Sequence, residues 1–398
     1  MRIYRRQMAW GWLLLFLLGI FGGSAAAAQN DDTDLRAFYE AEMQEKDYKI
    51  AKAIVRGIQY DDTAEIRSDI PVEADIRYQH LILEILTGEH RSEVLTVRHT
   101  IEMIMPGNYI FKVNDQVLIR LTENAEREIE TVKIEERVRD TSIYVITALF
   151  AVMMLLIGRK QGLKALLSLI IMVSLIFFAY IPMILKGFSP ILLSVAISAL
   201  AITVTLVIIS GRHKKTAAAI LGTISGVLIA GLLAVIFGEA GRLTGLSADT
   251  AISLAYIPHF RGLDYKGLLF GTIIIGSIGA IMDVSLSIAS SLWEIWELNP
   301  AIPVRQLIRS GMNIGRDIMG SMSNTLILAY VGTSLHLIIL FMVYQISFTE
   351  IINYDSVSSE ILRAMAGSIG LMFTIPATVW ISAALYPGLK KIGEKKHG

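Results

Sequence analysis

The second half of the chain carries repeated apolar runs of about twenty residues, and this pattern constrains the fold more than any other feature. A run of this length can cross a hydrocarbon core of roughly 30 Å as an α-helix. The runs fall at 142–158, 163–185, 189–210, 217–237, 268–291, 319–344 and 363–388. Because 54% of the 398 residues are hydrophobic and only 18% are charged, a bilayer explains the surplus better than a soluble core does. The sequence predicts a polytopic α-helical membrane protein with about seven spans in the lipid bilayer.

Residues 1–28 have the order of a secretory signal, namely a basic start, an apolar stretch and a run of small residues. Three arginines lie within the first six residues, the apolar stretch begins at Met8, and the small residues end at Ala28. We expect either a signal peptide that is cleaved after Ala28 or an uncleaved signal anchor. In both cases the residues that follow are exported.

Residues 29–140 have a different pattern, in which short segments rich in β-branched residues alternate with turn residues. After a short charged helix at 31–47, strands are predicted at Ala51–Tyr60, Ile76–Thr87, Glu93–Ile101, Gln116–Leu121 and Thr131–Glu136. Five short strands predict a small OB-like barrel or a sandwich. The chain has no cysteine, so this domain is expected to be stable by packing alone. Residues 141–398 then form the transmembrane domain.

Basic residues gather between alternate apolar runs, and this asymmetry predicts the membrane topology. Basic clusters lie at 159–164, 212–215, 305–316 and 390–396, whereas 186–188 and 345–360 are poor in basic residues. Because basic loops tend to stay in the cytoplasm, the β-rich domain is expected to be extracytoplasmic and the C-terminus cytoplasmic. Ends on opposite sides require an odd number of spans, which agrees with seven apolar runs.

Asp283 lies deep within the fifth apolar run. A carboxylate at that depth costs at least a few kcal/mol, so it usually faces the protein interior and is often functional. Residues three or four positions apart share a helical face. The face of Asp283 includes Gly276, Ala280, Ser287 and Glu294. We expect this face to line a polar path, with Asp283 as the ion- or proton-coupling group.

The sixth apolar run presents a second polar face, with Asp317 at its edge and Asn324 well inside it. Before this run, Arg305 and Arg309 share the polar side of an amphipathic helix. These two arginines and Arg316 are candidate charge partners for the acids. Small residues on both runs are expected to permit close helix packing. They are Gly276, Gly279, Ala280, Gly311, Gly315 and Gly320.

A structural role is the alternative for each of these residues. Polar groups of one membrane helix can simply hydrogen-bond to another helix and lock the bundle, and small residues are ordinary in membrane packing. Arginines beside an apolar run can serve only as topology signals. The sequence leaves both interpretations open.

Several chemistries leave motifs that this sequence lacks. It has no ATPase-type phosphate-binding loop, no His-Glu-x-x-His metal motif and no Gly-x-Ser-x-Gly nucleophile elbow. Lysine plus arginine and aspartate plus glutamate both total 36, so the charge balance favours no nucleic-acid partner. We therefore expect a protein that is not an enzyme and that holds no cofactor or metal.

Two long motifs carry a family likeness. One is Gly271–Val284, which continues into Ser287–Ser291, and the other is Ser310–Gly320, which continues into Asn324–Tyr330. Together with Leu254–Pro258 and the exported strand domain, they resemble the YibE/F family over nearly the whole chain after the signal. The resemblance implies a multi-pass protein of the bacterial cell membrane that is permease-like and has no accepted catalytic or binding site.

The leading hypothesis is a transporter or permease whose substrate, an unknown small molecule or ion, moves past Asp283. The membrane region is also similar to resistance-nodulation-division and SecD/SecF-type domains, in which an intramembrane acid is tied to proton flow. The alternative is a membrane scaffold or export accessory whose exported domain binds a protein or an envelope polymer. An odd number of spans without an evident internal repeat favours a homo-oligomer or a partner subunit in the membrane.

Overall fold

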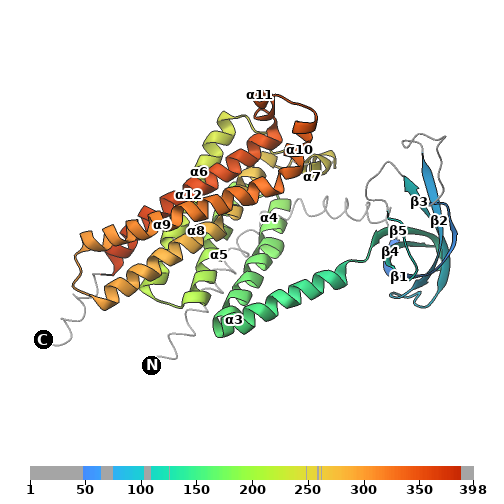
Figure 1. The fold of residues 1–398 in the computed structure, drawn as a ribbon, viewed down its shortest axis with the longest axis horizontal. Coiled ribbons are helices and arrows are strands. Elements are labelled where there is room, and N and C mark those ends of the chain that lie inside the picture. Colours follow the sequence, from blue (N-terminus) through green and yellow to red (C-terminus); the bar gives the residue numbers. More distant parts are fainter. Residues whose placement is uncertain are drawn as a thin grey trace. The chain divides into compact units, whose positions relative to one another are not determined.

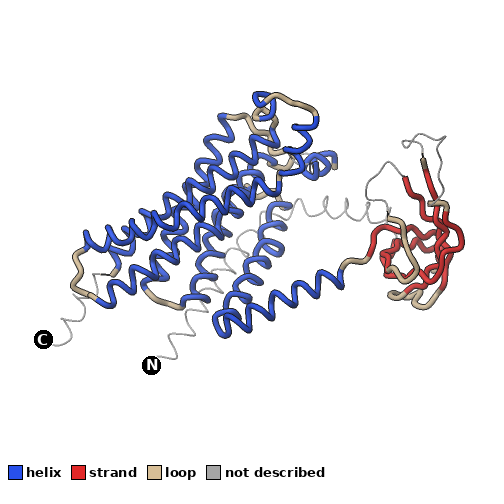
Figure 2. The backbone as a smooth tube through the Cα atoms, in the orientation of Figure 1, coloured by secondary structure: helices blue, strands red, loops and turns tan. Residues whose placement is uncertain are grey.

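A computed structural model describes residues 48–63, 75–102, 109–124, 126–247, 249–257, 260 and 262–386 (Figure 1). The chain forms two compact units, Met1–Val152 and Met153–Gly398. All described strands lie in the first unit, and Figure 2 distinguishes them in red from the helices in blue. The predicted signal segment 1–28, the predicted charged helix at 31–47 and residues 387–398 lie outside the described residues.

The first unit contains one antiparallel sheet of five strands, which fall on the five predicted segments. They are β1 (Tyr48–Asp61), β2 (Ile76–Ile85), β3 (Val94–Glu102), β4 (Gln116–Glu123) and β5 (Ile129–Arg137). The strand order is β3-β2-β1-β4-β5, and the edge strands β3 and β5 approach each other, so the sheet curls into a nearly closed barrel. The predicted small β-rich domain is confirmed.

Alternation of apolar and polar side chains explains why these segments form a barrel. Every second residue of β2 and β4, and of β1 between Ala51 and Val55, points into the interior, and the residues between them face outward, as the pleat of a strand requires. The buried core is made of Ala51, Ala53, Val55, Leu81, Leu83, Ile85, Val97, Phe111, Val117, Ile119 and Leu121. A core of this kind needs no disulfide, in agreement with a chain that has no cysteine.

Gln79 is a polar residue at a core position of β2, and it is fully buried. Its side-chain oxygen accepts from the Phe111 backbone N–H at 2.9 Å, and its amide nitrogen donates to the Phe111 carbonyl at 3.1 Å. The same nitrogen donates to Asp61 Oδ2 at 2.8 Å. Gln79 therefore ties the segment before β4 to the barrel interior and satisfies backbone groups that water cannot reach.

We expect Gln79→Leu to destabilise the β-rich domain by on the order of 3 kcal/mol, because both backbone groups of Phe111 lose their buried partner. Urea unfolding of residues 29–140, expressed alone, measures this change. Gln59→Leu, on the exposed side of β1, is the matched control and is expected to shift stability by about 0.5 kcal/mol or less. Equal effects of the two substitutions would contradict the role assigned to Gln79.

Helices make up the rest of the described chain. They are α3 (Asp140–Leu175), η2 (Ile176–Tyr180), α4 (Ile181–Leu185), α5 (Pro190–Ser210), α6 (Lys214–Ala240), α7 (Asp249–Tyr256), α8 (Tyr265–Leu298), α9 (Val304–Thr333), α10 (Leu335–Val343), α11 (Phe348–Ile351) and α12 (Asp355–Leu385). Within the described residues, five helical stretches are long and apolar enough to cross a membrane, or six if α9 and α10 form one bent span. The predicted class of polytopic helical membrane protein is confirmed.

The difference from the seven predicted runs lies mainly in one stretch, Asp140–Leu185, which is 46 residues long. This is more than twice the roughly 20 residues that one crossing needs. At Arg159 the backbone leaves helical geometry, with φ 46° and ψ −125°, between the predicted runs 142–158 and 163–185. A Cβ atom on Gly162 would overlap the carbonyl oxygen of Met154, so the chain doubles back closely at this point.

The sixth predicted run, 319–344, is not a straight helix. α9 ends at Thr333, and α10 continues after Ser334 at an angle of 57°. Gly332 and the β-branched Thr333 are weak helix formers, which accounts for a break at this position. The predicted start of this helix directly after Pro303 agrees with the structure, where Pro303 precedes the first helical residue of α9.

The helical unit is organised around the contact of α6 with α12, and α8 packs against both. Small residues allow the backbones to come close, as is common between membrane helices. A Cβ atom on Gly226 of α6 would overlap the Thr374 hydroxyl and lie 2.8 Å from the carbonyl oxygen of Gly370. A Cβ atom on Gly222 would overlap the Thr378 hydroxyl in the same way. These positions therefore have room for glycine alone.

We expect Gly226→Ala to destabilise the helical unit by about 1–3 kcal/mol, because the added methyl group forces α6 away from α12. Gly332→Ala on α9 is the matched control, because a Cβ atom there meets nothing within 4 Å. Thermal unfolding in detergent, followed by size-exclusion chromatography, measures both variants. A Gly226 variant as stable as the control would show that the helices separate at little cost.

Candidate functional site

One face of α8 is polar along its length. Its members recur every three or four residues, which places them on one side of the helix. They are Thr272, Gly276, Gly279, Asp283, Ser287, Ser290, Glu294 and Glu297. Ser290 is half-buried and all the others are exposed in the structure. The polar face predicted around Asp283 therefore extends along α8 from Thr272 to Glu297.

The opposite face of α8 is the one that packs into the bundle. Ile274, Ile281 and Ile288 are all but fully buried there, against α6 and α12. Burial of these β-branched side chains turns the Asp283 face outward. The expectation that Asp283 faces the interior of its own bundle is therefore not met, because the apolar face of α8 occupies that interior.

α9 presents a second exposed polar face next to α8. Asn313, Asp317, Ser321 and Asn324 recur on one side of this helix, and all four are exposed. Gly320 lies on the same side. The buried side of α9 consists mainly of small and aliphatic residues that contact α12 and α8.

Two contacts fix how α8 and α9 run past each other. A Cβ atom on Gly311 would lie 2.9 Å from Leu292 Cδ1, and a Cβ atom on Gly276 would lie 3.2 Å from the Tyr330 hydroxyl. The two helices are therefore antiparallel. Asp283 lies level with the segment around Gly320 in this arrangement.

The charged groups of the two faces have no ionic partner within the described part of the chain. Asp283 and Asp317 form no hydrogen bond or ion pair there, and neither do Glu294 and Glu297. Arg305 and Arg309 are likewise exposed without a carboxylate within ion-pair distance among the described residues. The ion pairs anticipated between these arginines and the acids are not formed within the described chain.

The arginine nearest the middle of α9 has one polar neighbour. Arg316 Nη1 donates to Asn313 Oδ1 at 3.5 Å, a long hydrogen bond on an exposed face. The arrangement leaves a strip of carboxylates on α8 beside a strip of guanidinium groups on α9. The exposed carboxylates, amides and hydroxyls of this surface can hydrogen-bond to a polar partner or to water.

The small residues predicted to permit close packing divide into two groups. Gly311 and Gly315 meet α12 and α8 so closely that Cβ atoms there would press on Val379 and Ile375. Gly279 and Gly320 face open space, with nothing within 4 Å of a Cβ atom. Gly276 also packs closely, since a Cβ atom there would lie 3.2 Å from the Tyr330 hydroxyl, and Ala280 is half-buried against the core. Of the six predicted positions, only Gly279 and Gly320 make no close contact inside the described bundle.

Sequence reasoning missed a buried hydroxyl cluster behind α8. Ser285 Oγ donates to the Ala219 carbonyl at 2.8 Å and shares a 2.9 Å hydrogen bond with Thr378 Oγ1. Tyr386, also fully buried, donates to the Ala289 carbonyl at 2.9 Å. The glycines and hydroxyl residues that recur in the runs 217–237 and 363–388 were the available signal.

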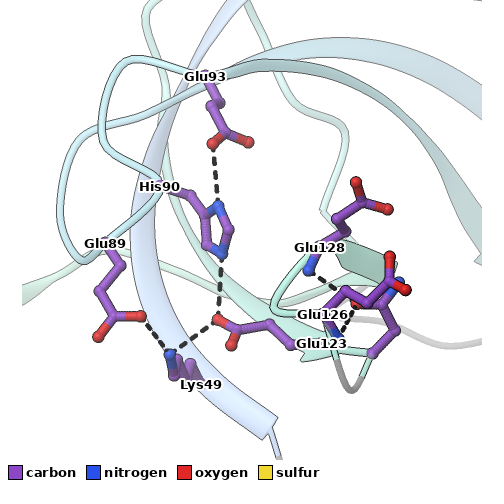
Figure 3. A network of polar contacts seen from close by, with 8 residues as sticks. Lys49, Glu89, His90, Glu93, Glu123, Glu126 and Glu128 are labelled. Atoms are coloured by element: carbon purple, nitrogen blue, oxygen red, sulfur yellow. Dashed lines mark hydrogen bonds and ion pairs between the residues drawn. The ribbon is translucent and has the colours of Figure 1, made fainter.

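The β-rich domain carries a polar network of its own. Figure 3 shows Lys49 between Glu89 and Glu123, at 2.6 and 2.9 Å from their carboxylate oxygens. The imidazole of His90 lies between Glu93, at 2.9 Å, and Glu123, at 3.1 Å. This network joins the start of β1, the β2–β3 turn and the end of β4. No group of three or more histidine, aspartate or glutamate side chains in the described chain could hold a metal ion.

The charges of the network shift one another's proton affinity. The hydrogen bond to Glu93, aided by the one to Glu123, raises the pKa of His90. The hydrogen bond from Lys49, aided by the one from His90, lowers the pKa of Glu123. The network is therefore most strongly paired where His90 is protonated and Glu123 is ionised.

Two family models match the chain. The model described as YibE/F-like protein matches residues 146–388, and the model described as YibE/F family N-terminal domain matches residues 46–137. The chain belongs to the YibE/F family. No curated protein and no solved structure matches it. The resemblance inferred from the motifs on α8 and α9 is thus confirmed.

The two family models match the β-rich domain and the helical region of this YibE/F protein separately. The N-terminal match holds all five strands and the Lys49–His90 network. The second match begins within α3 and holds α8 and α9 with their polar faces. The family description names no substrate and no reaction, so function has to be argued from these faces.

We expect the His90 network to stabilise the β-rich domain within a limited pH window. Because the folded pKa of His90 is raised, its contribution is present below the unfolded value near 6.5 and is lost as the pH rises through the folded value. Because the folded pKa of Glu123 is lowered, its contribution is lost as the pH falls through that value.

Thermal unfolding of the domain across the pH range measures this effect. The difference in melting temperature between wild type and His90→Asn should be greatest near about pH 5.5 and shrink toward about pH 8.5. His80→Asn is the control, because His80 packs edge-on against Tyr60 and contacts no carboxylate among the described residues. A difference that does not vary with pH would contradict the assignment.

Proposed function

We propose that this YibE/F protein is a membrane transporter for a small molecule or an ion, coupled to ion or proton movement through Asp283. One observation carries the proposal: the exposed polar face of α8, from Thr272 to Glu297, runs along a helix whose buried side is mainly apolar. A structural helix in a membrane has no use for a continuous row of polar groups, since each one has to be hydrated or paired. Such a row of polar groups is expected where a helix lines a path for a hydrated solute.

The two glutamates of this face lie at the end of the path, and Asp283 is the carboxylate nearest its middle. It has no ionic partner in the described chain, so binding or loss of a proton or cation alters its charge without breaking an existing pair. Ser287 and Asn324 supply neutral hydrogen-bonding groups near it on the two helices. Asp317 lies about one helical turn from the level of Asp283, whereas Glu294 lies nearer the loop that joins α8 to α9, where it would form an acidic entrance or exit. A change of charge at Asp283 biases the two helix faces toward one of two arrangements, which coupled transport requires.

We expect Asp283→Asn to abolish proton-driven flux, because the amide keeps the size of the side chain and removes its ability to ionise. Purified protein in liposomes, with a pH-sensitive dye inside and an imposed pH gradient and membrane potential, measures the flux. Wild type should acidify or alkalinise the lumen faster than empty liposomes, and Asp283→Asn should match the empty liposomes.

Ser225→Ala is the matched control for this experiment. Ser225 is a half-buried polar residue of α6 whose hydroxyl donates to the Leu221 carbonyl of the same helix, away from the α8 face. Size-exclusion chromatography confirms that both variants fold. Wild-type flux in Asp283→Asn would reject the coupling role of Asp283, and no flux in wild type with several cations would favour the alternative below.

The alternative is a membrane scaffold or export accessory, and the independence of the β-rich domain favours it. This domain has its own hydrophobic core and belongs to a separate compact unit. As a scaffold, the protein would act by binding a partner through this domain while the helices hold it at the membrane. Rescue of a deletion strain by the domain fused to an unrelated single membrane anchor would support the scaffold, and rescue that requires Asp283 would support the transporter.

A further inference from the structure

The polar faces of α8 and α9 lie uncovered within the described chain. Asp283, Ser287, Asp317 and Asn324 are exposed, in segments that are long and apolar enough to cross a membrane. Lipid tails offer no hydrogen bonds, and a charged group exposed to them costs at least a few kcal/mol. A protein surface or enclosed water has to cover these faces in the membrane.

The glycines on these faces indicate that a helix, rather than water alone, approaches them. Gly279 and Gly320 meet nothing within 4 Å of a Cβ position, while Gly311 and Gly315 on the buried side of α9 are closely packed. Small residues in membrane helices commonly mark the place where another backbone comes close. The two open glycines lie on the same uncovered surface as Asp283.

The acids of α8 and the arginines of α9 have opposite charges, so this surface is complementary to the same surface on a second copy of the chain. α8 carries Glu294 and Glu297, and α9 carries Arg305 and Arg309, all without an ionic partner in the described residues. Because the helices are antiparallel, with Gly311 beside Leu292, the two acids lie at the same height as the two arginines. A two-fold axis along the membrane normal preserves height, so α8 of one copy would meet α9 of the other with opposite charges level.

One other apolar segment, residues 142–158, does not have the chemistry to cover this surface. The segment from Ser142 to Gly158 carries no charged side chain. It therefore offers no partner to Asp283 or to the arginines. A second copy offers partners for both signs of charge.

We infer that two copies of this protein associate through the exposed faces of α8 and α9. The interface is isologous, with α8 of each copy against α9 of the other, and the Asp283 carboxylates of both copies line the space between them. The dimer follows from the uncovered faces alone, and the use of that space as a path rests on the proposed transport function. One copy by itself leaves the polar path open to lipid.

The absence of cysteine makes the interface directly testable. Leu328 lies on the exposed face of α9 with 67% of its surface accessible, and Leu232 lies on α6 with 58% accessible. Single-cysteine variants Leu328→Cys and Leu232→Cys are reconstituted at high lipid excess and treated with a short bis-maleimide. We expect a covalent dimer from Leu328→Cys and monomer from Leu232→Cys.

A second pair of variants separates assembly from folding. Gly320→Leu fills open space on the proposed interface, and Gly158→Leu fills equally open space elsewhere. Both should keep the melting temperature of the monomer in detergent, but only Gly320→Leu should shift the protein from dimer to monomer, as counted by single-molecule photobleaching in liposomes.

Three outcomes would overturn the dimer. They are monomer in liposomes for the wild type, equal cross-linking at Leu232 and Leu328, and a Leu328→Cys product that contains a different protein in native membranes while the purified protein stays monomeric. Flux that depends on Asp283 in a protein shown to be monomeric would keep the transport proposal and reject the interface. A dimer without flux would do the reverse.

Discussion

The close contact between α6 and α12 is the constraint on which the helical unit depends. Gly222 and Gly226 leave room for the hydroxyls of Thr378 and Thr374, so the two backbones approach more closely than larger side chains would allow. α8 then packs into the groove that they form, and Ser285 hydrogen-bonds to α6 and α12 there. Since lipid tails are as apolar as leucine, this fit and these hydrogen bonds, rather than hydrophobic burial, stabilise the bundle.

The same contact determines where the charges lie. The row of isoleucines on one side of α8 packs into the groove between α6 and α12, so the side that carries Asp283 faces away from this groove. α9 covers part of α8 with its own small and aliphatic side and likewise turns Asp317 and Asn324 outward. The faces of α8 and α9 that do not pack in the bundle are polar and stay exposed. Both the transport proposal and the proposed association of two copies rest on this exposed surface.

Sequence patterns predicted the elements well and the interfaces poorly. The five strands, the helix start after Pro303 and the shared face around Asp283 follow from local periodicity and from turn and cap residues, which depend on near neighbours in the chain. The bend at Ser334, the reversal at Arg159 and the direction that Asp283 faces depend on distant segments. Small residues alone did not reveal that Gly311 is packed while Gly320 is open.

The sequence by itself determined that this chain is a helical membrane protein with a β-rich domain, because long apolar runs and alternating strands have a fixed period that can be read residue by residue. Its two long motifs carried the resemblance to the YibE/F family, which the family models confirm. It also placed Asp283 on a polar helical face. Only the tertiary structure decided which side of α8 is buried, because this depends on which of its two faces packs better into the groove between α6 and α12. The row of isoleucines fits between α6 and α12 without leaving a charge unpaired, and so the polar row is the one left exposed.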